Sequence, residues 1–95
     1  MRHFLNTGVK MIKEMTDFIA RFTYKPVQKA VADKIRAKAI QRTKARLAIY
    51  HQTLEDYSDD ELEIIIEDEE RKIIDSLKTK SLIAVLSLLG ISLFP

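Results

Sequence analysis

The feature that most constrains this fold is the absence of glycine and proline from residues 27–89, between Pro26 and Gly90. Proline destabilises a helix interior by about 3 kcal/mol and glycine by about 1 kcal/mol relative to alanine. The first half of this stretch is also rich in alanine, lysine and arginine, which are strong helix formers. The sequence therefore predicts an all-α protein, and its 95 residues allow one small core.

The N-terminal segment, residues 4–22, has the pattern of an amphipathic helix. Apolar residues recur at three- and four-residue intervals, at positions 5, 9, 12, 15, 19 and 22. Lys10, Lys13 and Arg21 lie off this apolar stripe. We expect the helix to end before Pro26, because the residue that precedes a proline is disfavoured in the helical conformation.

Two longer helices are predicted after Pro26. The first covers about 26–53, with a thin apolar stripe at Val27, Val31 and Ile35 and a broad basic surface. The second covers about 59–80. Its start is predicted by Ser58 and Glu61, which have the spacing of a capping box. We expect the two helices to pack antiparallel, joined by a turn around residues 56–58.

Charge is distributed in two opposite blocks. Residues 1–52 contain twelve Lys/Arg and three acids, a net charge of +9, whereas residues 53–75 contain eleven acids and two Lys/Arg, a net charge of −9. Blocks of equal and opposite charge on consecutive helices indicate that the helices face and screen one another.

Residues 81–95 contain no charged side chain, so we divide the chain into a charged helical domain, 1–80, and an apolar C-terminal tail, 81–95. The tail either continues the preceding helix or follows a break near 79–81. Because it is apolar on all sides, something must cover the surface that a small core leaves exposed. The predicted membrane or partner contacts are Leu82, Ile83, Val85, Leu86, Leu89, Ile91, Leu93 and Phe94. Small residues at three-residue intervals would allow close helix packing: Ser81, Ala84, Ser87 and Gly90.

Three kinds of cover fit this tail. Fifteen helical residues span roughly 22 Å, which is less than the ~30 Å core of a bilayer. Lipid nevertheless suits the tail, because Lys78 and Lys80 adjoin it and the first helix offers a cationic side and the apolar face of Met11, Ile12, Met15, Ile19 and Phe22. The other two kinds are the core of this chain or of a homo-oligomer, and a docking site for another helical protein. No secretory signal is visible at the start, so we expect the cytoplasm or the cytoplasmic face of a membrane.

The alternative function is binding to nucleic acid or the ribosome through the basic helix 26–53. The candidate anion contacts are Lys29, Arg36, Lys38, Arg42 and Arg46. Tyr50 is the only aromatic residue close to them, which gives base stacking little support. The adjacent acidic block would also compete for the same cations.

The sequence predicts no enzyme, cofactor or metal site. Cysteine is absent, and the two histidines, His3 and His51, are far apart in sequence. The acidic run at 59–63 lacks the ligand spacing of a calcium loop, and charge at a helix N-terminus explains it better. The sequence thus favours a small non-enzymatic protein that associates through its apolar tail and its cationic first helix.

Overall fold

The structure is a computed structural model that describes residues 13–92. Within this range every regular element is helical and no strand occurs, which confirms the all-α prediction. The elements are a helical segment at 13–19, α2 (Lys25–Ala48), a short 3-10 helix η1 (Leu54–Asp56), α3 (Asp59–Leu77) and α4 (Leu82–Leu88). The expected long helices are therefore present, although each ends before its predicted C-terminal limit.

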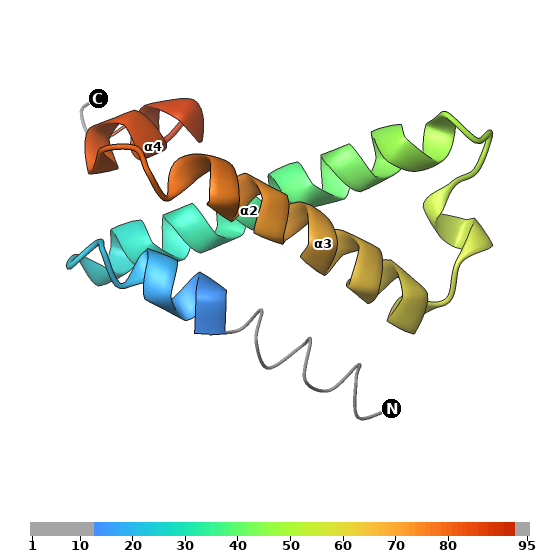
Figure 1. Ribbon diagram of the computed structural model, residues 1–95, viewed down its shortest axis with the longest axis horizontal. Coiled ribbons are helices and arrows are strands. Elements are labelled where there is room, and N and C mark those ends of the chain that lie inside the picture. Colours follow the sequence, from blue (N-terminus) through green and yellow to red (C-terminus); the bar gives the residue numbers. More distant parts are fainter. Residues whose placement is uncertain (1–12, 93–95) are drawn as a thin grey trace.

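Helices α2 and α3 run in opposite directions and cross each other, so that their ends separate toward the 49–58 connection (Figure 1). The sequence predicts an antiparallel pair; in the structure the two helices have opposite directions and cross at an angle (Figure 1). A ten-residue connection that contains η1 takes the place of the expected turn at 56–58. Ion pairs between the two helices join Arg36 of α2 to Glu63 and Glu70, and Arg46, in the last turn of α2, to Asp68 and Glu69.

Helix α2 presents a stripe of residues at four-residue spacing to the core: Val31, Ile35, Ala39, Thr43 and Leu47. Thr43 is fully buried, and its hydroxyl donates a hydrogen bond to the Ala39 carbonyl at 2.8 Å. That bond satisfies a polar group that would otherwise be costly to bury. The other side of the core comes from α3, chiefly Ile66, Ile73, Ile74 and Leu77.

Helix α3 begins as the sequence predicts. The Ser58 hydroxyl accepts from the Glu61 backbone N–H at 3.2 Å, and the Glu61 carboxylate accepts from the Ser58 backbone N–H at 3.1 Å. These reciprocal bonds satisfy two backbone donors that have no partner within the helix, as a capping box does. Asp59, Asp60 and Glu61 add negative charge at the positive end of the helix dipole.

The C-terminal tail does not extend α3. The helix ends at Leu77, and Ser81 caps a separate helix, α4, by accepting from the Ala84 backbone N–H at 3.2 Å. Helix α4 lies at the end of the molecule where α2 begins and α3 ends, far from the 49–58 connection (Figure 1). Its Val85, Leu86 and the following Leu89 belong to the core cluster.

Candidate functional site

Two of the five candidate anion contacts form ion pairs with acidic residues of α3. Both Arg36 and Arg46 lie on α2 and point toward α3. Arg36 contacts Glu63 at 2.7 Å and Glu70 at 2.9 Å, whereas Arg46 contacts Asp68 at 3.2 Å and Glu69 at 3.4 Å. The opposite charge blocks therefore do face each other. Arg36 and Arg46 stabilise the α2–α3 interface and are not free cations on the surface.

Burial and charge oppose each other at this interface. The side chains of Glu69 and Glu70 are both less than a tenth exposed. Burial of a charged carboxylate without a cation beside it costs free energy, because the charge loses its hydration. Burial raises the pKa of Glu70 and outweighs the opposing effect of Arg36. The pKa of Arg36 is itself raised, chiefly by its hydrogen bonds to Glu63. Glu63 is thus the main partner of Arg36, and Glu70 is a buried acid that Arg36 compensates only in part.

The other three candidates differ in their surroundings. Lys29 pairs with Asp33 on the exposed side of α2, at 3.1 Å. The side chains of Lys38 and Arg42 form no ion pair or hydrogen bond with any residue between 13 and 92. They lie four residues apart, each one position before a residue of the buried stripe, so that they share one flank of α2.

Lys38 and Arg42 line a groove between three elements, with a volume of about 170 Å³. Its other lining residues are Ile73, Ser76 and Leu77 of α3, Lys80 from the α3–α4 connection, and Leu88 and Leu89 at the end of α4. Among the described residues that line it there is no carboxylate. The Lys80 side chain, like Lys38 and Arg42, has no acidic partner in the described chain. The groove therefore combines three uncompensated cations with an apolar floor.

The predicted tail contacts divide into three groups. Val85, Leu86 and Leu89 are buried in the core of this chain, and Ile91 packs against it. Leu82 and Ile83 are exposed, Ile83 by 79%. Leu93 and Phe94 lie outside the described residues. The prediction that these side chains meet a membrane or a partner is thus corrected for the first group, because they already fill this chain's own core.

Leu88 was not among the predicted contacts, yet its side chain is 53% exposed and lines the groove. The sequence contains one signal for it. Once Ser81 is taken as the cap of a separate helix, Val85, Leu86 and Leu89 form one face by helical spacing and Leu88 falls outside that face. A tail read as one continuous apolar helix hides this distinction.

The small residues of the tail have separate roles. Ser81 is the N-cap of α4, and Gly90 follows its C-terminus with a positive φ of 73°. Gly90 N–H bonds to the Ser87 carbonyl and Ile91 N–H to the Leu86 carbonyl, which is the pattern of a Schellman motif. Only Ala84 and Ser87 lie within α4 itself. The packing prediction required these four residues to lie on one face of a helix. In the structure two of them lie at its ends, so they do not form such a face.

The N-terminal helix turns its apolar face inward. Phe18 and Phe22 are buried, and Met15 and Ile19 pack against the same core. This corrects the expectation that this face docks into lipid or another helix, for the part that is described; Met11 and Ile12 lie outside the described residues. The cation Arg21 sits 5.6 Å above the Phe18 ring.

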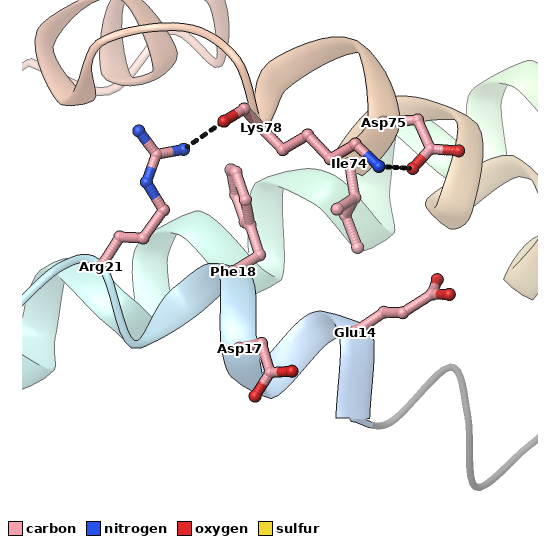
Figure 2. A pocket seen from close by; sticks show the side chains of 7 residues that line it. All are labelled: Glu14, Asp17, Phe18, Arg21, Ile74, Asp75 and Lys78. Atoms are coloured by element: carbon pink, nitrogen blue, oxygen red, sulfur yellow. Dashed lines mark hydrogen bonds and ion pairs between the residues drawn. The ribbon is translucent and has the colours of Figure 1, made fainter.

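Arg21, which follows the N-terminal helix, also forms hydrogen bonds with the backbone at the end of α3. Its guanidinium donates to the carbonyls of Lys78, at 3.2 Å, and Lys80, at 2.7 Å. Carbonyls at a helix C-terminus lack partners within the helix, so Arg21 acts as a cap from outside. Figure 2 shows the hollow beside this contact. Its charged lining residues are the cations Arg21 and Lys78 and the acids Glu14, Asp17 and Asp75. Unlike the α2–α4 groove, this hollow contains charges of both signs.

The described residues contain no candidate metal site. His51 is exposed and His3 lies outside the described residues. Between residues 13 and 92, no three histidine or acidic side chains gather as metal ligands would. None of the helices described in the structure combines the length and the apolar character that crossing a bilayer requires.

Comparison of the chain with protein-family models, with curated proteins and with solved structures found no match in any of the three.

Proposed function

We propose that this protein is a non-catalytic peripheral protein that binds the anionic surface of a membrane, on its cytoplasmic face, through α4 and the cations beside it. The observation that carries the proposal is the position of Leu88: an exposed apolar side chain of α4 in the same groove as Lys38, Arg42 and Lys80. Apolar side chains enter the headgroup region, and neighbouring cations attract anionic lipid at about 1 kcal/mol each.

The rest of α4 supports the same orientation. The core side of the helix is occupied by Val85, Leu86 and Leu89, whereas Ile83, Ala84, Ser87 and Leu88 lie around its outer side. No charged residue interrupts this outer side. A helix of seven residues with an uncharged outer side can lie in the interface while the remaining helices stay in water.

The proposal is narrower than the one drawn from the sequence. The N-terminal helix is not assigned to lipid, because Phe18 and Phe22 are buried. Arg36 and Arg46 are not assigned either, because their charges are paired with α3. Another helical protein or a second copy of this chain would also cover the outer side of α4, and the test below distinguishes a second copy from lipid.

Nucleic-acid binding is the second candidate, supported by the row of Lys34, Lys38 and Arg42 at four-residue spacing on α2. No acid of the described chain pairs with any of these three side chains. The candidate ranks second because the exposed aromatic residue nearest to this row in sequence, Tyr50, lies outside α2, after its C-terminal end.

Vesicle sedimentation tests the proposal. The full chain is mixed with vesicles of phosphatidylcholine alone and with vesicles containing one quarter phosphatidylglycerol. We expect it to pellet with the anionic vesicles only, and Ile83→Asp/Leu88→Asp to abolish this. The matched control is Ile49→Asp/Ile64→Asp, which adds the same charge at two exposed apolar positions away from α4 and should pellet like the wild type.

Two results would overturn the membrane proposal. The first is equal recovery of both double variants with the vesicles. The second is a wild-type chain that stays in the supernatant while Ile83→Asp/Leu88→Asp dissociates a dimer in analytical ultracentrifugation, which would assign α4 to a second copy. Salt-dependent binding to RNA or DNA without any vesicle binding would favour the second candidate instead.

A further inference from the structure

We infer that the groove between α2, the end of α3 and α4 holds the phosphate of one anionic phospholipid, with Lys38, Arg42 and Lys80 as its ligands and Leu88 and Leu89 beneath the first carbons of the lipid. This inference rests on the proposed function and adds a defined headgroup site to it.

Charge is the first argument. The cations of α2 that face the acids of α3 are neutralised, as the 2.9 Å contact between Arg36 and Glu70 shows. Lys38 and Arg42 lie outside this network, and the nearest acid in sequence to Lys80, Asp75, is paired with Lys78 at 3.1 Å. A site with three positive charges and no carboxylate among its described lining residues is complementary to an anion.

The source of these cations is the second argument. Lys38 and Arg42 come from α2, whereas Lys80 comes from the connection that follows α3. The backbone at Lys80 is held in place, because its carbonyl accepts a 2.7 Å hydrogen bond from Arg21. The three charges are therefore brought together by the tertiary structure and are not simply neighbours along one helix.

The size and floor of the groove decide between kinds of anion. Its volume of about 170 Å³ lies below the range of roughly 300–1,000 Å³ that is usual for pockets enclosing a whole small ligand. The apolar floor of Ile73, Leu77 and Leu89 would gain nothing from a free inorganic ion. A headgroup phosphate whose remaining atoms continue over exposed Leu88 fits both the charge and the floor.

Titration with a soluble lipid tests binding at this groove without a membrane surface. Dihexanoyl phosphatidylglycerol below its micellar concentration is titrated into the full chain, with chemical-shift changes followed by NMR. We expect saturable one-to-one binding, with the largest shifts at Ser76, Lys80 and Leu88. Dihexanoyl phosphatidylcholine and inorganic phosphate should bind at least tenfold more weakly.

Charge-matched variants provide the decisive comparison. Lys38→Ala/Arg42→Ala should weaken binding of the soluble lipid roughly thirtyfold. Lys34→Ala/Lys44→Ala removes the same charge from the same helix outside the groove and should change binding by less than about threefold. Alanine preserves helix propensity, and circular dichroism should confirm that both variants are folded.

Three results would overturn the inference. Equal weakening by the two double variants would mean diffuse attraction without a site. Inorganic phosphate binding as tightly as the lipid would make the groove a free-anion site. Absence of saturable binding to the soluble lipid, in a chain that still pellets with anionic vesicles, would remove the groove while leaving the proposed function in place.

Discussion

Arg36 holds Glu63 with both terminal nitrogens of its guanidinium, at 3.0 and 2.7 Å from the two carboxylate oxygens. The nitrogen at 3.0 Å also donates to Glu70, at 2.9 Å. Paired donors of this kind give a directional contact that a lysine cannot reproduce. One side chain of α2 thus binds two acids of α3, one of them buried, and so helps to determine where the two helices cross.

Removal of this side chain should destabilise the fold. We expect Arg36→Met, which keeps most of the packing, to lower the free energy of unfolding by about 2–3 kcal/mol. This is below the usual cost of breaking a buried pair, because Arg36 is itself 37% exposed. Lys29→Met breaks an exposed pair on the same helix and should cost less than about 1 kcal/mol. Urea denaturation measures both, and equal losses would contradict the role given to Arg36.

The buried acid should make stability depend on pH in an unusual direction. Burial raises the pKa of Glu70 above 4.5, and burial also raises the pKa of Glu67. A raised folded pKa means that the folded chain binds the proton more tightly than the unfolded chain. The contribution of these two groups to stability is therefore greatest at low pH, and is lost as the pH rises from about 4.5 through their folded pKa values.

Asp68 acts in the opposite direction. Desolvation raises its pKa, but the hydrogen bonds and positive charges of Lys72 and Arg46 outweigh desolvation and lower the pKa below 3.8. The contribution of Asp68 to stability is therefore lost as the pH falls through that lower range. We expect thermal stability to fall as the pH rises above about 4.5, through loss of the Glu70 and Glu67 contributions, and to fall as the pH drops below about 3.8, through loss of the Asp68 contribution. Glu70→Gln should flatten the upper part of this curve. An unchanged dependence of stability on pH above about 4.5 in this variant would contradict the assignment.

Two helix ends offer a matched test of backbone strain. Both α2 and α4 end in Schellman motifs, with His51 (φ 59°) and Gly90 (φ 73°) in the left-handed position. We expect His51→Gly to stabilise the protein by up to about 1 kcal/mol and Gly90→Ala to destabilise it by about the same amount. A Cβ at Gly90 would meet no atom within 4 Å, so the loss would come from φ alone. Changes of the same sign in the two thermal melts would contradict this account.

The division of the tail between core and surface is tested by two adjacent leucines. Leu89 is 4% exposed and Leu88 is 53% exposed. We expect Leu89→Ala to cost about 2–4 kcal/mol, because it removes buried methyl groups and leaves a cavity. Leu88→Ala makes the same chemical change and should cost less than about 1 kcal/mol. Chemical denaturation of the two variants compares them, and similar losses would mean that both side chains are buried.

Local patterns determined the parts of this fold that depend on neighbours in sequence. The stretch free of glycine and proline specifies helices, and Ser58 with Glu61 specifies where α3 begins. Pro26 lies in the first turn of α2, as expected. Each of these interactions spans at most one helical turn, so residue type and spacing are sufficient to predict it.

The position of the free charges was decided by the tertiary structure. The two charge blocks predict that α2 faces α3, but spacing along α2 does not distinguish Arg42 from Arg46. Their surroundings differ because α3 crosses α2: Arg46 meets Asp68, whereas Arg42 faces the groove beside α4. The crossing depends on packing between residues far apart in sequence, including fully buried Ala39 and Thr43.

The tail shows the same division between sequence and structure. Its uncharged composition determines that it must be covered, since burial of apolar surface drives folding and association alike. Which residues fold back and which remain exposed depends on the break at 78–81, where Arg21 binds two carbonyls from the other end of the chain. That contact joins residues almost sixty positions apart, and only the folded chain brings them together.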